Sequence, residues 1–157
     1  MYYIIVIATT LVLPIGAALI ESFALHSVAS LILLLGKWYV LFAVGVRLFL
    51  AGLRQTFTPG FTLKEIFEID APAANHIVQE LGFANLSMGT LGLLALLDPM
   101  LTLAGAITGG LYYGLAGLKH IAKGNRNAMR TAAMITDLLV FAVLAAYVFL
   151  AVSRMSA

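Results

Sequence analysis

Long apolar stretches separated by short polar connections run along almost the whole chain, a pattern typical of membrane-spanning helices. The first stretch covers residues 2–20. About 20 apolar residues, at a rise of ~1.5 Å each, are enough to cross a hydrocarbon core ~30 Å thick. We predict four further spans at about residues 37–54, 81–97, 100–121 and 131–152. Together these segments predict one all-α domain over residues 1–157, a polytopic membrane helix bundle.

The stretch from Ser22 to Gly36 is apolar but is interrupted by a histidine and two serines. It is compatible with a short interfacial helix, with a re-entrant helix, or with the first half of a long tilted second span. We favour the interfacial helix, with the second span beginning at about Lys37. The choice matters because a span beginning near Val28 would place Arg47 close to the far interface.

The connection over residues 56–75 is the one substantial polar segment between spans. A Thr-Pro-Gly turn precedes residues 61–67, in which Thr62 and Glu65 have the spacing of a capping box. Apolar residues in that stretch recur at intervals of three and four, so they share one helical face. The pattern predicts a short amphipathic helix lying on the membrane surface.

The turn between the third and fourth spans is very short, because Asp98-Pro99 both breaks one helix and starts the next. We therefore expect these two spans to be antiparallel neighbours. Small residues in the fourth span form two pairs with i, i+4 spacing, Gly105 with Gly109 and Gly110 with Gly114. Such pairs let another helix approach closely, and we interpret them as packing notches rather than as a pocket.

Composition agrees with the membrane assignment. The chain is 62% hydrophobic and 10% charged, whereas a soluble domain is about half apolar and a quarter charged. It contains no cysteine, which excludes disulfides, thiol redox chemistry, and iron–sulfur or zinc sites built on cysteine. No basic run is interleaved with aromatic residues, so we expect the lipid bilayer as a partner and no nucleic acid.

Five spans place the two ends of the chain on opposite sides of the membrane. One side would hold six basic residues, Arg54, Lys64, Lys119, Lys123, Arg126 and Arg130. The other side would hold two, Lys37 and Arg154. The positive-inside rule then predicts a bacterial inner (plasma) membrane protein with a cytoplasmic N-terminus and an external C-terminus.

Two arginines, Arg47 and Arg54, lie seven residues apart at the end of the second span. That spacing is about two helical turns, so both side chains share one face and lie ~10 Å apart. A charge within a membrane helix is unfavourable by ~2.5–3.5 kcal/mol on insertion scales and therefore needs a partner.

Counting depth from the cytoplasmic ends of the spans gives two polar layers. Near the boundary we place Arg54, Glu80 and His120, with His76 as a further candidate. About 10 Å deeper lie Arg47, Asn85, Asp137 and either Tyr112 or Tyr113. We predict two ion pairs, Arg54 with Glu80 and Arg47 with Asp137.

Three interpretations of these layers stay open at the level of sequence. The pairs can simply join helices, they can line a ligand cavity that faces the cytoplasm, or they can form a proton or ion pathway. His26 falls on the outer side, while the other two histidines fall on the inner side. No histidine pair has metal-ligand spacing. We expect no metal site, no cofactor and no catalytic residue.

Short motifs around these polar positions carry a family resemblance. Arg47-Leu-Phe-Leu-Ala-Gly-Leu-Arg54, followed by Phe57-Thr-Pro-Gly, resembles the first core helix of DoxX-like bacterial membrane proteins, and Glu80-Leu-Gly-Phe-Ala-Asn-Leu resembles their second. The likeness covers roughly residues 37–152, with residues 2–36 as an added N-terminal span, and the whole chain also resembles uncharacterised five-span bacterial proteins. The resemblance implies a four-helix membrane core. Some DoxX-like proteins are subunits of quinone-linked thiosulfate oxidation, but this chain has no redox motif, so only the fold is carried over.

Three functions compete. The leading prediction is a small accessory or scaffold membrane protein with no catalysis of its own, associated with a membrane protein partner. The alternative is a binder, or a membrane-enzyme subunit, for a lipophilic small molecule such as a quinone. A transporter is the third, although no repeated broken helices point to one. A cavity that reaches Arg47 would favour the second function over the first.

Overall fold

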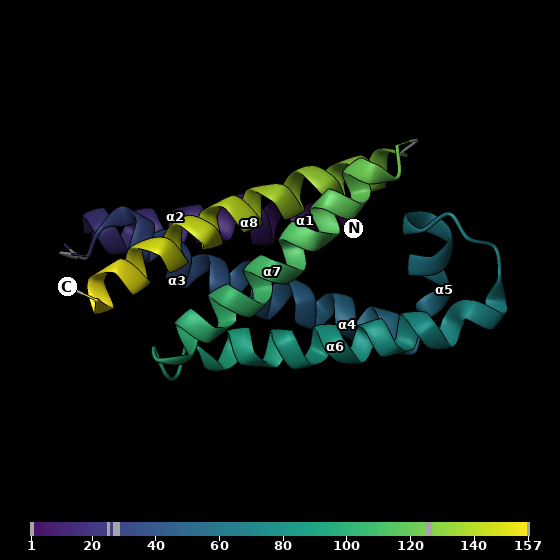
Figure 1. The fold of residues 1–157 in the computed structure, drawn as a ribbon, viewed down its shortest axis with the longest axis horizontal. Coiled ribbons are helices and arrows are strands. Elements are labelled where there is room, and N and C mark those ends of the chain that lie inside the picture. Colours follow the sequence, from purple (N-terminus) through teal and green to yellow (C-terminus); the bar gives the residue numbers. More distant parts are fainter. Residues whose placement is uncertain (1, 25, 27–28, 125–126, 157) are drawn as a thin grey trace.

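The computed structural model describes residues 2–24, 26, 29–124 and 127–156. This part of the chain is helical and contains no strand. Figure 1 shows long helices packed side by side and running in alternating directions along the bundle. The all-α bundle predicted from the sequence is confirmed.

The first two long helices each contain π-helical turns. The first comprises α1 (Tyr2–Ile7), η1 (Ala8–Val12), α2 (Leu13–Leu19) and η2 (Ile20–Ala24). The second comprises α3 (Leu31–Tyr39), η3 (Val40–Leu48) and α4 (Phe49–Phe57). The π-helical η1 directly precedes the turn that holds Pro14, whose ring has no N–H to donate to the regular helical pattern.

The preferred interpretation of the stretch from Ser22 to Gly36 is wrong. The first helix continues to Ala24 and the second begins at Leu31, so most of this stretch belongs to the two long helices, and the residues described between them form no helix of their own. The physical reason is the apolar run Leu31-Ile-Leu-Leu-Leu, which continues directly into the helix that carries Arg47. The second helix is therefore 27 residues long.

The rest of the chain folds into one short helical segment and three long helices. These elements are α5 (Pro59–Phe61), η4 (Thr62–Ile66), the 3₁₀ turn η5 (Pro72–Ala74), α6 (Asn75–Leu94), α7 (Leu101–Ala122) and α8 (Ala128–Met155). Two boundaries are marked by local geometry: Gly124 has φ 74° just past the end of α7, and the side chain of Asn127 accepts from the backbone N–H of Arg130 at the start of α8.

In the described part of the chain, four helices are long and apolar enough to cross a membrane, over residues 2–24, 31–57, 101–122 and 128–155. This indicates a membrane protein. The predicted third span, now α6, is not among the four, because polar residues such as Gln79, Glu80 and Asn85 lower its hydropathy. It nevertheless runs antiparallel to the second helix and packs along it (Figure 1).

Glycines allow the closest helix contacts. A Cβ added at Gly92 would meet the backbone of Gly45, so α6 and η3 touch through their main chains. In α7, a Cβ at Gly109 would overlap Val44, whereas one at Gly110 would have an ordinary contact of 3.5 Å with the nearest side chain. The predicted packing notches are therefore present at Gly109, and Gly110 has room for a methyl group.

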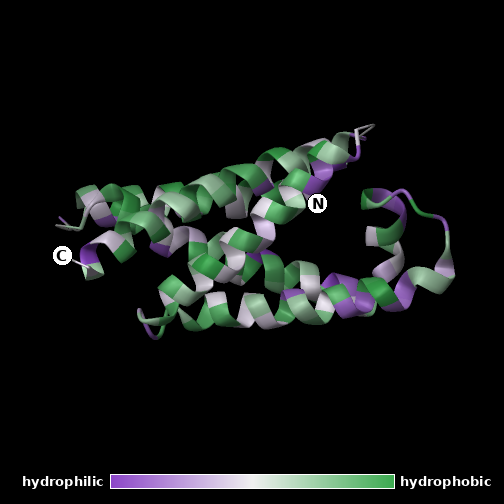
Figure 2. Ribbon diagram, in the orientation of Figure 1, coloured by the Kyte–Doolittle hydropathy of each residue, from purple (hydrophilic) through white to green (hydrophobic). Residues whose placement is uncertain are grey.

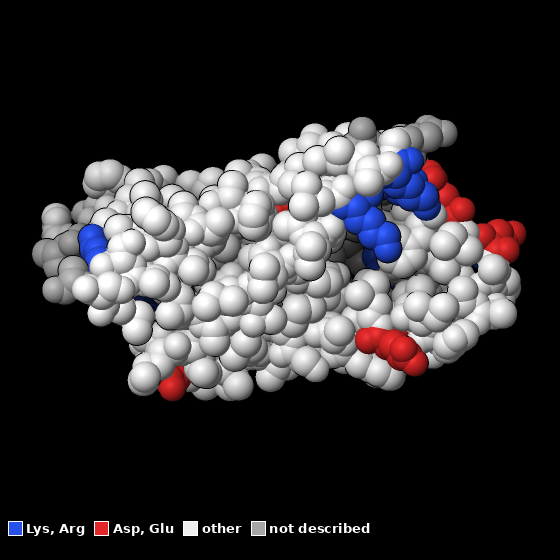
Figure 3. Space-filling model, in the orientation of Figure 1, with Lys and Arg blue, Asp and Glu red and all other residues white. Residues whose placement is uncertain are grey.

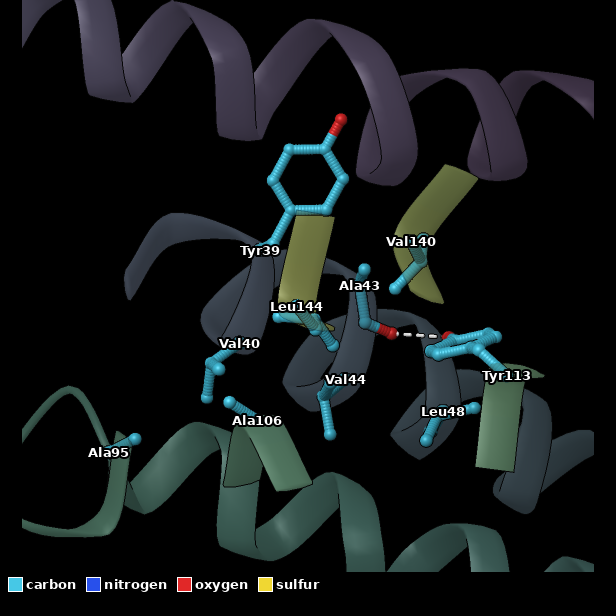
Figure 4. Close-up of a cluster of buried hydrophobic side chains, with 10 residues drawn as sticks. All are labelled: Tyr39, Val40, Ala43, Val44, Leu48, Ala95, Ala106, Tyr113, Val140 and Leu144. Atoms are coloured by element: carbon cyan, nitrogen blue, oxygen red, sulfur yellow. Dashed lines mark hydrogen bonds between the residues drawn. The ribbon is translucent and has the colours of Figure 1, made fainter. Parts of the chain in front are cut away.

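The buried core lies where η3 meets α7 and α8 (Figure 4). Within it the hydroxyl of Tyr113 donates to the carbonyl oxygen of Ala43 at 2.6 Å. At the end where the second helix begins, Lys37 and Trp38 both contact the carboxylate of Glu21, at 2.8 and 2.7 Å. Hydrophobic residues cover most of the bundle, and hydrophilic ones gather where α6 begins, at the opposite end (Figure 2).

Candidate ligand-binding site

A cavity of about 690 Å³ lies at this more hydrophilic end of the bundle, which we call the cavity end. Its walls come from the start of α1, the end of η3 with α4, residues 61–69, α6, the second half of α7, and the first half of α8. Four helices each contribute two cavity-lining residues seven positions apart, Arg47 with Arg54, Val78 with Asn85, Tyr113 with His120, and Arg130 with Asp137. Because seven residues make about two turns, the two members of each pair lie ~10 Å apart along their helix, and Arg47, Tyr113 and Asp137 meet in a deep layer.

The deep layer contains the predicted ion pair. Arg47 Nη2 lies 2.8 Å from Asp137 Oδ1, and the two side chains are 11% and 8% exposed. The same guanidinium makes longer contacts with the hydroxyl oxygens of Thr10 and Thr136, at 3.4 and 3.3 Å. It also lies over the ring of Tyr113, 5.1 Å from the centroid.

The two threonines were missed by the sequence reasoning, because an isolated hydroxyl in an apolar run has no distinctive spacing. Thr10 and Arg47 both lie in π-helical segments, η1 and η3. Such segments are often found at functional sites. Here they bring two distant parts of the chain into contact at the cavity wall.

Asn85 does not lie in the deep layer as predicted, because its partner Gln55 is the neighbour of Arg54 and places Asn85 level with that arginine. Its Nδ2 donates to Gln55 Oε1 at 2.6 Å, and its side chain is almost fully buried. Among the described residues, however, its Oδ1 has no hydrogen-bond partner. Of the two tyrosines considered from the sequence, Tyr113 is satisfied by a backbone carbonyl, while Tyr112 is half-buried and lines the cavity.

The predicted pair between Arg54 and Glu80 is wrong, since both residues are described and no ion pair joins them. The guanidinium of Arg54 instead lies over the ring of Phe61, 3.4 Å from the centroid. Glu80 is exposed and does not line the cavity. At 100° per residue it lies about 200° around α6 from the cavity-lining Val78, on the opposite face.

A short segment closes the cavity end. We call residues 59–69, which contain α5 and η4, the closing segment; it stands across the end of the bundle in Figure 1. The predicted amphipathic helix is present here, and its apolar residues Phe61, Leu63 and Ile66 line the cavity. The capping box is wrong, because the helix already begins at Pro59 and Thr62 is buried within it.

Arg130 holds the closing segment in place, a role that the sequence reasoning missed. Its side chain is 1% exposed, and Nη1 lies 2.8 Å from Glu68 Oε2. Its Nε and Nη2 donate to the carbonyl oxygen of Ile66 at 3.2 and 2.9 Å. Two further contacts join the same elements, from Lys123 Nζ to the Phe67 carbonyl and from Asn127 Nδ2 to the Glu65 carbonyl, at 3.1 and 2.9 Å.

The histidines do not converge. His120 is half-buried and lines the cavity, whereas His76 is exposed outside it. Within the described residues, no group of three or more His, Asp or Glu side chains could hold a metal ion. Chemically, the cavity offers an apolar wall that also carries amide and phenol groups. An arginine–aspartate pair lies at its base, and lysine and arginine side chains lie near its rim.

Comparison with known proteins gives a family and no function. Neither the comparison with curated proteins nor that with solved structures found a match. A family model matches residues 4–157, and its description is a family of unknown function, DUF6790. This is not the DoxX family, and the comparisons add no support to that resemblance. Because the match covers nearly the whole chain, the protein belongs to the DUF6790 family.

Proposed function

We propose that this protein binds a lipophilic small molecule of the bilayer in its cavity, either on its own or as the ligand-binding subunit of a membrane complex. The observation that carries the proposal is the cavity itself. Its volume of about 690 Å³ falls within the ~300–1,000 Å³ of typical small-molecule sites. The predicted scaffold function needs no such space, because helix bundles otherwise pack with few voids larger than a water molecule.

The walls of the cavity suit a ligand that arrives from the lipid. Ile77 and Leu81 of α6 and Leu115 and Ala116 of α7 line it, and Ile77 and Leu115 are 59% and 67% exposed. The two helices are joined at the Asp98 turn and diverge toward the cavity end (Figure 1). We infer that a lipophilic molecule enters sideways between α6 and α7.

Polar groups along the cavity lining suit a ligand that carries a polar group of its own. The buried Oδ1 of Asn85 can accept a hydrogen bond, and the hydroxyl of Tyr112 can donate or accept one. Arg47 gives one short bond to Asp137 and only long contacts to its threonines, so it has N–H capacity for a ligand carbonyl or hydroxyl. A quinone is one molecule with these properties.

We also propose that the cavity end faces the cytoplasm and that α6 is a fifth span of a bacterial inner-membrane protein. Support comes from the basic residues, since Arg54, Lys119, Lys123 and Arg130 line the cavity while Arg154 lies at the other end. The positive-inside rule then places the N-terminus inside and the C-terminus outside. Five traversals are supported by α6, which crosses the bundle from the cavity end to the Asp98 turn (Figure 1).

The test is to fill the cavity and measure what the protein retains. In Ala116→Trp the indole would enter the cavity, whereas in Leu118→Trp, on the same helix, it would point outward from an exposed position. After purification in a mild neutral detergent, native mass spectrometry should find a bound small molecule on the wild type and on Leu118→Trp, and not on Ala116→Trp.

A second blocking variant, Ala51→Trp, approaches the cavity from α4 and guards against a folding defect peculiar to α7. Folding of every variant is checked by circular dichroism and thermal unfolding. Equal retention by the blocked and control variants, or an empty wild type that gains nothing from added lipid extract, would return the scaffold function to first place.

A further inference from the structure

We propose that the ligand is an anionic single-chain amphiphile, whose carboxylate or phosphate head lies among Arg54, Lys119 and Lys123 while its chain extends along α4 and α7 toward the middle of the bundle. This inference rests on the proposed function and narrows its ligand class. It differs from the neutral quinone considered above, and it follows from the charges at the cavity rather than from its volume alone.

The charges around the cavity do not balance. Its lining contains five lysines and arginines and a single carboxylate, Asp137. Arg47 is paired with that carboxylate and Arg130 with Glu68. All seven acidic residues of the chain are described, and none of them forms an ion pair with the three remaining cations, Arg54, Lys119 and Lys123.

These three cations all line the same cavity, which favours an anion site over a uniformly charged surface. Arg54 is half-buried and stacks the face of its guanidinium on Phe61, which leaves the N–H edge for an oxyanion. Lys119 and Lys123 are four residues apart on the last turns of α7, so they project from neighbouring positions of one face. Figure 3 shows lysine and arginine side chains gathered beside a hollow in the surface at this end.

Part of the apolar lining lies deeper in the bundle than these cations. Leu115 and Ala116 precede Lys119 on α7, Leu50 and Ala51 precede Arg54 on α4, and all four line the cavity. A head group at the cations therefore places its chain along α4 and α7 toward the middle of the bundle, the orientation of an amphiphile in the surrounding leaflet. Lys119 and Lys123 are exposed, which allows an ionic head to enter without full desolvation.

The volume suits a ligand with one chain. At ~30 Å³ for each water-sized unit, 690 Å³ corresponds to roughly 23 non-hydrogen atoms. A fatty acid or a lysophospholipid of small head group is of that size. A phospholipid with two chains is about twice as large and would leave one chain outside the cavity.

The experiment compares ligands that share one chain and differ in the head. The probes are oleate, oleoyl lysophosphatidic acid, neutral monoolein and inorganic phosphate, each titrated into purified protein in neutral detergent and followed by native mass spectrometry. At least one of the two anionic lipids should bind about tenfold more tightly than monoolein, because a charge-assisted hydrogen bond is stronger than a neutral one. Inorganic phosphate should bind weakly. The two anionic probes show whether the carboxylate or the phosphate is preferred.

Three variants connect the preference to these residues. Lys119→Gln and the double variant Arg54→Gln/Lys119→Gln should lose most of the anionic preference while keeping monoolein binding. Arg154→Gln removes a cation at the opposite end of the bundle and should change nothing. The wild-type comparison of heads decides the inference even if a cavity variant fails to fold.

The outcomes separate this inference from the function on which it rests. If monoolein binds as tightly as both anions and Ala116→Trp abolishes all three, the cavity is a lipophilic site but the anionic head is wrong. If inorganic phosphate binds as tightly as the anionic lipids, the chain plays no part and the amphiphile is wrong. If no probe binds, or if Ala116→Trp binds them all unchanged, the proposed function fails as well.

Discussion

Breaking the ion pair between Arg47 and Asp137 should destabilise the protein strongly, and removing both charges should restore much of the loss. Asp137→Asn leaves a guanidinium beside a neutral amide, and Arg47→Met leaves an unpaired carboxylate. The pair is separated by 2.8 Å and its side chains are 11% and 8% exposed. Each remaining charge would therefore be largely buried, with only an edge facing the cavity.

The expected magnitude follows from this burial. Removing one partner of a buried ion pair is unfavourable by ~3–5 kcal/mol, because the other charge is left uncompensated. The pair borders a cavity, where water or ligand groups can solvate an exposed edge, so we expect the lower value of ~3 kcal/mol for each single variant. For a chain of this size, that corresponds to a fall in Tm of about 6–12 °C.

The double variant Arg47→Met/Asp137→Asn should be closer to the wild type than either single variant, because it leaves no charge unpaired. A remaining loss is expected, since the contacts from Arg47 to Thr10 and Thr136 disappear as well. Unfolding can be followed by the fluorescence of Trp38, the single tryptophan. It lies at the opposite end, bonded to Glu21 at 2.7 Å, so it reports global unfolding.

Two results would refute this reasoning. Losses that simply add in the double variant would mean that the two side chains do not interact in the folded protein. Single variants that keep the wild-type Tm would mean that the charges are solvated where they lie, and the energetic argument from burial would fail. If such stable variants also lost the retained ligand, the pair would belong to the site rather than to the stability of the bundle.

Three further predictions test the packing, the closing segment and the orientation. Gly109→Ala should lower the free energy of unfolding by ~1–3 kcal/mol in the same thermal assay, because the added methyl group overpacks the contact with Val44. Gly110→Ala, where the contact is ordinary, should change it by less than ~0.5 kcal/mol. Equal effects of the two variants would contradict a packing notch at Gly109. Glu68→Gln should speed hydrogen exchange across residues 59–69 and leave the core unchanged, because it removes an ion pair that joins this segment to α8; unchanged exchange there would show that the backbone contacts suffice. Cysteines replacing Lys64 and Arg154 should be labelled from the cytoplasm and from outside respectively, and labelling from the same side would exclude an odd number of spans.

The deep ion pair could be predicted from the sequence because few alternatives exist. Within the spans, Arg47 and Asp137 are the charges farthest from any predicted helix end, and depth is fixed by counting residues at ~1.5 Å each. A charge in an apolar helix needs a partner, so the two charges at matching depth specify each other. Length and hydropathy also suffice for the four long apolar helices.

The polar positions near the cavity end, around Arg54, could not be predicted in the same way. The depth of a residue does not determine the direction in which its side chain points around the helix. Arg54 and Glu80 lie at similar depth, but α6 turns Val78 and Asn85 toward the cavity and Glu80 away from it. The rotation of α6 is set by the glycine contacts along the second helix. Those contacts depend on which helices are neighbours in the bundle. Counting residues along the chain does not identify these neighbours.

The role of Arg130 was missed for a different reason. At the start of a span, an arginine is expected to extend to the membrane surface. Its burial depends on the closing segment folding back over it, with Glu68 in the left-handed conformation at φ 57°. The sequence around residue 68 has no glycine that would signal such a turn, so nothing local indicates the contact.

The position of the cavity can be explained by the direction in which the α7 glycines face. A Cβ at Gly105 or Gly109 would meet valine side chains of the second helix, while one at Gly114 or Gly117 would meet side chains of α8. Glycines therefore hold α7 against the second helix only in its first half, whereas they hold it against α8 farther along. From Gly109 onward α7 follows α8 and moves away from α4 and α6. The cavity occupies the space between them, so it is part of the packing pattern of the bundle and should persist with or without its ligand.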